Sequence, residues 1–208
     1  MSMMIESLEN TLQIAVLLLC AALALLQAVR GRSRAWMLAF FFFGSFLLGD
    51  IYWLAVLLFF DQTPQISVVS DLSWYASYLF LYLLLRQLDP PEERGKASLL
   101  AWTGPAFAAG MAVFFMLRGE ILSNLIYASL MGLLLFASLR RLADRGETAG
   151  SKFLPLLVLI FCALEYALWT ASCFWAGDTL QNPYYWFDFL LTLSFPCFIP
   201  AVRRAVKA

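Results

Sequence analysis

The sequence contains no histidine. The commonest metal ligand, the usual general base and the usual pH-sensitive side chain are therefore all missing, which excludes zincin-type hydrolase sites and histidine-based catalytic triads. Any proton chemistry falls to carboxylates, tyrosines or water. We expect no bound metal and no cofactor.

Charge is also scarce. Asp, Glu, Lys and Arg make up 13% of the 208 residues, against roughly 25% in an ordinary soluble domain. The 14 basic residues equal the 14 acidic ones in number, so no positive excess points to nucleic acid as a partner. Hydrophobic residues account for 62% of the chain. This composition predicts a multi-pass protein of the cell (plasma or inner) membrane, in contact with the lipid bilayer and forming one domain over residues 1–208.

Only four cysteines are present, and none forms a CxxC pair. They are Cys20, Cys162, Cys173 and Cys197, and each falls in an apolar run that is predicted to be helical. We expect them to be reduced thiols that pack as small apolar residues.

Seven stretches are long and apolar enough to cross a bilayer as helices, since a span needs about 20 mostly apolar residues. Their predicted limits are 11–29, 35–60, 67–87, 98–117, 121–140, 153–175 and 184–201. The predicted fold class is therefore all-α, with seven transmembrane helices.

Basic residues alternate between the connecting stretches. Arg118 is the only one of the 14 that falls on the side where Asp61, Glu120 and Asp178 lie. The others follow the first, third, fifth and seventh spans: Arg30, Arg32, Arg34, Arg86, Arg94, Lys96, Arg140, Arg141, Arg145, Lys152, Arg203, Arg204 and Lys207. The positive-inside rule then places the N-terminus outside and the C-terminus in the cytoplasm.

Four carboxylates lie inside the apolar runs: Asp50, Asp71, Glu165 and Asp188. A carboxylate in hydrocarbon is so unfavourable that it is a functional-site hypothesis by default. Asp50 and Glu165 have no Lys or Arg at a matching depth. We expect them to be protonated, hydrogen-bonded to hydroxyls and amides such as Gln13 or Asn124, or paired with a group from outside the chain. Asp71 and Asp188 have a second interpretation, because each is close enough to a helix N-terminus to act as a cap.

The acidic residues suggest an internal repeat. The second and third spans align on the sixth and seventh, with Asp50 over Glu165 and Asp71 over Asp188. Both pairs run in the same direction across the membrane, which predicts a parallel repeat with three helices, a linker helix and three helices. Such a repeat would bring the four carboxylates to one outward-facing cavity.

Aromatic side chains share helix faces with these acids, at spacings of three or four residues. The candidate ligand-binding residues are Asp50, Asp71, Glu165, Asp188, Trp53, Trp74, Tyr75, Trp169 and Tyr185. Ring faces and carboxylates both attract positive charge, so this combination favours a small cationic or amphipathic ligand. The run that contains Tyr185 is also typical of an aromatic belt at the membrane interface.

The same residues resemble motifs of two known protein families. Gly49-Asp50-Ile51-Tyr52-Trp53, followed by Ser70-Asp71 through Phe80, resembles the multi-helix membrane input modules found ahead of bacterial cyclic-di-GMP cyclase and phosphodiesterase domains. That resemblance implies a sensor. The Gly49-Asp50 and Ser70-Asp71 dipeptides are also similar to those of the lysoplasmalogenases, membrane hydrolases that cleave the vinyl-ether bond of lysoplasmalogens, although that family has one more helix.

Three functions follow as hypotheses. The first is a sensor or transporter that binds the ligand in the acidic cavity. The second, implied by the lysoplasmalogenase resemblance, is a hydrolase in which one carboxyl protonates an ether oxygen and another activates water. The third is a membrane subunit whose carboxylates pair with basic residues of a partner protein. For the first, we expect Asp50→Asn to leave the fold intact or to stabilise it, and to abolish function.

Overall fold

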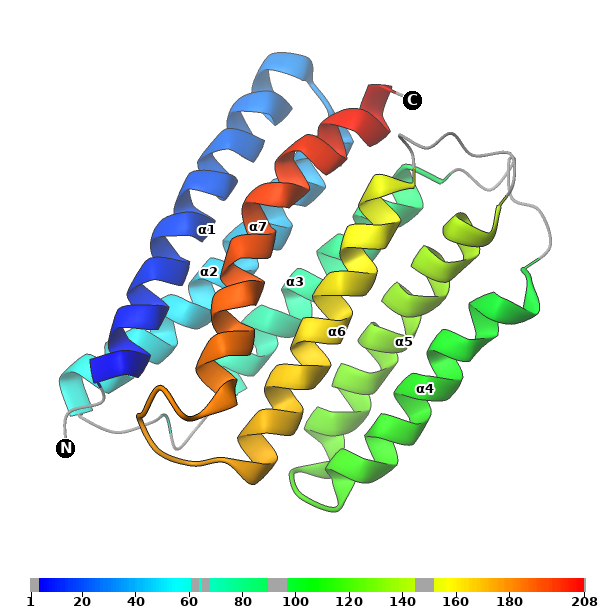
Figure 1. The fold of residues 1–208 in the computed structure, drawn as a ribbon. Coiled ribbons are helices and arrows are strands. Elements are labelled where there is room, and N and C mark those ends of the chain that lie inside the picture. The colour runs from blue at the N-terminus through cyan, green and yellow to red at the C-terminus, as the bar shows by residue number, and fades with distance from the viewer. Residues whose placement is uncertain (1–3, 61–63, 65–67, 90–96, 145–151, 208) are drawn as a thin grey trace.

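The computed structural model describes residues 4–60, 64, 68–89, 97–144 and 152–207. This part of the chain holds seven α-helices and no strand (Figure 1). They are α1 (Met4–Gly31), α2 (Arg34–Phe60), α3 (Val68–Gln87), α4 (Leu99–Met116), α5 (Ile121–Ala143), α6 (Phe153–Phe174) and α7 (Pro183–Lys207). All seven are long and apolar enough to cross a membrane, so the predicted number of spans is confirmed and the protein is a multi-pass membrane protein.

The predicted limits differ from the observed ones chiefly at two helix ends. α1 begins at Met4 rather than at residue 11, and α7 continues to Lys207 rather than ending at residue 201. The first turns of α1 carry Glu6, Glu9 and Asn10, which lower the local hydropathy although the backbone is helical. The last turn of α7 carries Arg204 and Lys207, where basic side chains complement the helix dipole.

The start of α7 follows from local sequence. Asn182 Oδ1 accepts a hydrogen bond from the backbone N–H of Tyr184 at 3.0 Å, which is how an asparagine N-cap satisfies a free donor. Pro183 occupies the first helical position, where its missing N–H has no consequence. The preceding turn contains Gly177 at φ +103°, a backbone conformation that favours glycine.

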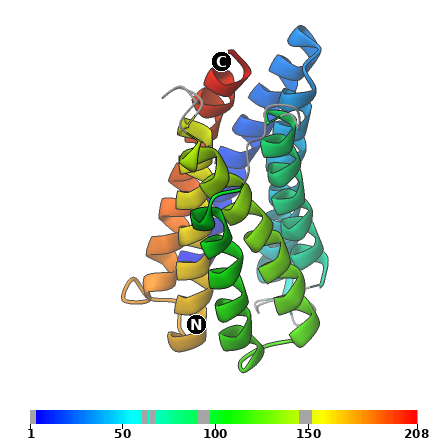
Figure 2. The ribbon, with the colours of Figure 1, turned by 90° about the vertical axis from the view of Figure 1, so that its right-hand side faces the viewer.

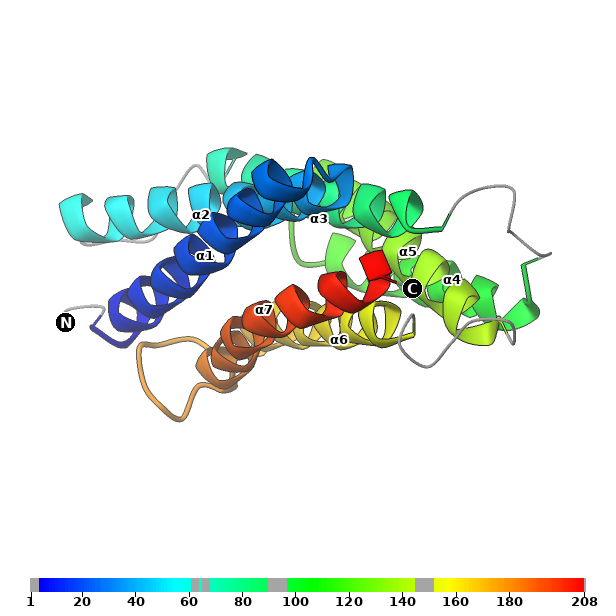
Figure 3. The ribbon, with the colours of Figure 1, turned by 90° about the horizontal axis from the view of Figure 1, so that it is seen from above.

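Six of the described helices form a ring in the order α1, α2, α3, α5, α6, α7 and back to α1. Figure 3 shows α1, α2 and α3 along one side and α6 and α7 along the other. α4 lies outside the ring, packed along α5 (Figure 2). Gly104 allows this close approach, because a Cβ there would lie 2.7 Å from Leu135 Cβ.

A cluster of phenylalanines fills the centre of the ring. Phe42 and Phe46 of α2 contact Phe195 of α7 at centroid distances of 6.1 and 4.9 Å, and Phe42 lies 5.8 Å from Phe161 of α6. Phe42, Phe161, Phe195 and Phe198 are completely buried. The cluster therefore joins opposite sides of the ring through apolar contacts.

The surface of the bundle is apolar where a lipid bilayer would touch it. On α1, Leu18, Leu19 and Leu26 are exposed while Glu9 and Gln13 are buried. This arrangement of apolar groups outside and polar groups inside is the reverse of a soluble protein and fits a helix bundle in lipid.

The two ends of the bundle differ in charge. The end formed by the last turns of α1, α3, α5 and α7 carries ten of the eleven described basic residues, and Arg118 lies at the other end (Figure 1). Asp61, Arg94, Lys96 and Arg145, which also entered the topology prediction, lie outside the described residues.

Candidate functional site

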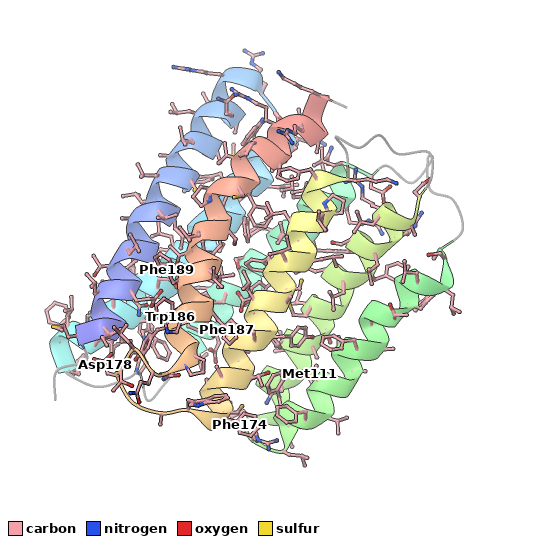
Figure 4. The ribbon with its side chains drawn as sticks, in the orientation of Figure 1. Met111, Phe174, Asp178, Trp186, Phe187 and Phe189 are labelled. Atoms are coloured by element: carbon pink, nitrogen blue, oxygen red, sulfur yellow. The ribbon has the colours of Figure 1, made fainter. Side chains whose placement is uncertain are left out.

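A cavity of about 740 Å³ lies inside the ring at the end opposite the basic residues. Its lining comes from the first three turns of α1, α3 and α7, the first turn of α5, and the later turns of α2 and α6. The end of α4, the α4–α5 turn and the α6–α7 connection complete it. Figure 4 shows Asp178 and Phe174 at this end of the bundle, with Asp178 near the start of α1 and Phe174 at the end of α6. Phe46, Tyr78 and Leu191 line the deepest part, next to the phenylalanine cluster.

The structure brings eight of the nine candidate residues to this cavity. They are Asp50, Asp71, Glu165, Asp188, Trp53, Trp74, Trp169 and Tyr185. Tyr75 is not in the lining. Its side chain is buried on the neighbouring face of α3, where the hydroxyl group is hydrogen-bonded to Ser123 of α5.

Asp50 is hydrogen-bonded to Trp74, and Gly49 leaves room for the indole ring. The indole Nε1–H of Trp74 on α3 donates to Asp50 Oδ1 on α2 at 3.0 Å. The ring can lie this close because residue 49 has no side chain: a Cβ on Gly49 would be 2.6 Å from Trp74 Nε1. Asp50 itself is 1% exposed and is near enough to Asp188 and Glu165 for an electrostatic interaction with both carboxyl groups.

Glu165 of α6 lies among aromatic side chains. It is 2% exposed and hydrogen-bonded to the hydroxyl group of Tyr78 on α3. Tyr127 of α5 packs against Tyr78 at 6.0 Å and against Trp169 at 4.9 Å between ring centroids. The hydrogen bond to Tyr78 therefore sets the direction of the carboxyl group, in surroundings that are largely aromatic.

Asp188 of α7 is joined to α1 by a polar network. The amide Nε2 of Gln13 donates to Asp188 Oδ1 and to Thr192 Oγ1, both at 2.9 Å. The buried carboxyl group of Glu9 lies next to that of Asp188.

The contribution of α1 to the cavity was not predicted from the sequence. Glu6, Asn10 and Gln13 line the cavity, and Glu9 stands behind them against Asp188. Their spacing of three or four residues places them on one helix face, and this regular polar stripe was the signal that could have found them. Gln13 was expected beside Asp50 or Glu165 but bonds Asp188 instead. Asn124 donates to the backbone oxygens of Phe115 and Glu120.

The remaining candidate residues lie nearer the cavity entrance. Trp53 donates its Nε1–H to Glu6 Oε1 at 2.9 Å and lies 5.8 Å from Trp74 between ring centroids. Asp71 is half-buried in the first turn of α3. Tyr185 is hydrogen-bonded to Asp178. Asp178 also accepts the backbone N–H groups of Ile5 and Glu6, at 3.1 and 3.0 Å, and so caps the start of α1.

The lining is strongly acidic. Among the described residues it contains six carboxylate residues, Glu6, Asp50, Asp71, Glu120, Glu165 and Asp188, and one basic residue, Arg118. Arg118 is exposed and stacks on Phe114 and Phe174, at 4.2 and 5.1 Å from its guanidinium carbon to the ring centroids. A site with this balance of charge attracts cations.

Two buried oxygens in the lining lack a hydrogen-bond partner among the described residues. They are Asp50 Oδ2 and Glu165 Oε1. Buried polar atoms are almost always paired, so each such atom calls for a ligand, an ion or water. The part of the chain that the structure describes offers no group of three or more Cys, Asp or Glu arranged to hold a metal ion.

These observations define a class: a multi-pass helical membrane protein with an acidic, aromatic cavity at one end of a ring of helices. Comparison of the chain with protein-family models, curated proteins and solved structures found no match.

Proposed function

We propose that the protein binds a small cationic or amphipathic ligand in the acidic cavity and acts as a sensor or a transporter. The observation that carries this proposal is the charge of the lining, which has six carboxylate residues and one exposed arginine among the described residues. Such a cavity repels anions and gives neutral molecules no electrostatic advantage.

The size and the aromatic content of the cavity support the same conclusion. Its volume of about 740 Å³ is within the roughly 300–1,000 Å³ of ordinary small-molecule sites. Trp74, Trp169 and Tyr185 are part of the lining, and aromatic rings can stabilise a cation that has lost its hydration shell.

We further propose that the cavity opens to the outside. The basic residues gather at the opposite end of the bundle (Figure 1), which by the positive-inside rule faces the cytoplasm. The order of helices around the ring is also compatible with a parallel repeat. Exchanging α1, α2 and α3 with α5, α6 and α7 leaves every neighbour relation in the ring unchanged, with α4 as the linker.

The phenylalanine cluster would have to move in different ways in a sensor and in a transporter. It closes the ring beneath the cavity, and its central rings are completely buried. A transporter would have to separate these rings to pass the ligand to the basic end of the bundle. A sensor would only have to move them.

A hydrolase is the second candidate, because two deeply buried carboxyl groups, Asp50 and Glu165, share one cavity and each has an open oxygen. Two carboxyl groups in different environments can act as general acid and general base. Release of aldehyde from a vinyl-ether lysolipid by the purified protein would establish this activity. The absence of release from a panel of lysolipids would remove it.

The binding proposal is tested with three aromatic probes of similar size and different charge: benzylamine, benzyl alcohol and benzoate. Thermal unfolding of the purified protein should shift upward with benzylamine and stay unchanged with the other two. Asp50→Asn should abolish the shift, whereas Asp144→Asn, at the basic end of the bundle, should preserve it. Equal shifts with benzylamine and benzyl alcohol would contradict a cation site. Loss of a co-purifying partner protein in Asp50→Asn would favour a partner-regulating subunit instead.

A further inference from the structure

We infer that the ligand is a protonated primary or secondary amine whose ammonium group donates hydrogen bonds to Asp50 and Glu165. This inference rests on the proposed function and deepens it, because it names the chemical class of the cation and the position of its charged end.

Two acceptors in the cavity are open. Asp50 Oδ2 and Glu165 Oε1 are buried and have no hydrogen-bond partner among the described residues. Both residues line the same cavity. Their residues come from α2 and α6, which are not neighbours in the ring. A group that satisfies both oxygens must therefore sit inside the ring.

The neighbouring acceptor positions are already taken. Trp74 donates to the second oxygen of Asp50 at 3.0 Å, Tyr78 is hydrogen-bonded to Glu165, and Gln13 donates to Asp188 Oδ1 at 2.9 Å. These three bonds fix the directions of the carboxyl groups before a ligand arrives. The two open oxygens are thus the positions prepared for a donor.

Cations that carry N–H groups can form hydrogen bonds to these two oxygens, whereas cations without N–H groups cannot. A primary ammonium has three N–H donors and a secondary ammonium has two, so either has enough donors for both open oxygens, and its single positive charge balances one carboxylate. A quaternary ammonium has no N–H, and it would leave both buried oxygens without a hydrogen bond. Charge-assisted hydrogen bonds are also about twice as strong as neutral ones, which adds to the preference.

The rest of the lining accommodates the body of the ligand. Phe46, Leu168 and Leu191 line the cavity together with Trp74 and Trp169. An apolar or aromatic substituent can therefore be buried beside the ammonium group.

The test compares two probes with the same body. Binding of phenethylamine and of trimethyl(2-phenylethyl)ammonium to the purified full-length protein would be measured by calorimetry at neutral pH. We expect phenethylamine to bind at least about tenfold more tightly, since one lost charge-assisted hydrogen bond accounts for that factor. Asp50→Asn and Glu165→Gln should each weaken phenethylamine binding and change trimethyl(2-phenylethyl)ammonium binding much less. Asp144→Asn is the matched control and should change neither.

The outcomes separate this inference from the proposed function. Equal or tighter binding of the trimethylated probe would overturn the inference and leave a cation-binding cavity in place. A failure of both cations to bind would overturn both proposals. If Asp50→Asn does not fold, the comparison of the two probes on the unmodified protein and on Glu165→Gln still decides the question.

Discussion

The indole of Trp74 lies directly over Gly49 and donates a hydrogen bond to Asp50, so that three residues on two helices form one unit. Gly49→Ala should break this unit, because the new Cβ would lie 2.6 Å from Trp74 Nε1 and the indole would have to move. We expect a loss of about 1–3 kcal/mol in unfolding free energy, the usual effect of removing the partner of a buried polar group. Chemical denaturation measures it.

Gly44→Ala is the matched control for this change. Gly44 lies on the same helix, and nothing is within 4 Å of a Cβ built there. Alanine has the higher helix propensity, so Gly44→Ala should leave stability unchanged or raise it by up to about 1 kcal/mol. Equal destabilisation by both substitutions would show that the contact between Trp74 and Gly49 is unimportant.

Gln13 joins α1 to α7 through Asp188 and Thr192. Leucine is similar in size to glutamine but has no hydrogen-bond donor, so Gln13→Leu should lower the unfolding free energy by about 1–3 kcal/mol. Thr192→Val should have a smaller effect, because the Gln13 amide keeps its bond to Asp188. Gln87→Leu, at an exposed position on α3, should have almost none. Comparable effects of Gln13→Leu and Gln87→Leu would contradict the role given to this amide.

Asp178 caps α1 from the α6–α7 connection and accepts the backbone N–H groups of Ile5 and Glu6. Asp178→Ala should destabilise the protein by about 0.5–2 kcal/mol, the usual cost of losing an N-cap acceptor. Asp178→Asn keeps one acceptor oxygen and should cost less. Hydrogen exchange of the Ile5 and Glu6 amides should accelerate in Asp178→Ala, and unchanged exchange there would show that this cap is not formed.

The helices could be predicted from the sequence, but their arrangement could not. Apolar runs of about 20 residues identify membrane spans directly, and all seven were found. The same measure began the first span too late, at residue 11, because Glu6 and Asn10 face the cavity and Glu9 is buried, so none of the three faces lipid. A hydropathy window averages over both faces of a helix and cannot separate them.

The candidate site shows the same limit. Asp50, Glu165 and Asp188 were identified because a carboxylate inside an apolar run is costly to bury and is therefore rare unless it serves a function. Tyr75 was included because it is four residues from Asp71. The structure places α3 between α2 and α5, so Trp74 faces Asp50 while Tyr75, one position further along, faces Ser123 of α5. Which neighbour a helix face meets depends on tertiary packing.

The proposed orientation of the bundle can be measured with single cysteines. In a variant with Cys20, Cys162, Cys173 and Cys197 replaced, Thr179→Cys would place a thiol at the cavity end and Ser98→Cys would place one at the basic end; both positions are exposed. We expect a membrane-impermeant thiol reagent to label Thr179→Cys in intact cells. Ser98→Cys should be labelled only after the membrane is opened. The reverse pattern would place the cavity on the cytoplasmic side.

Substitution of Arg118 tests most directly whether positive charge determines which ligands the cavity binds. Among the described residues it is the only basic one in the lining, and its guanidinium group is held at the entrance by Phe114 and Phe174. Arg118→Gln removes one positive charge from the path of an incoming cation, so affinity for a cationic ligand such as benzylamine should increase. Because Arg118 is exposed, we expect a change of only about two- to fivefold at low ionic strength, in line with the modest strength of surface charge interactions.

The gain in affinity should disappear at about 1 M salt, where the Debye length is about 3 Å. Weaker binding in Arg118→Gln at low salt would mean that the cavity selects its ligand by a property other than positive charge.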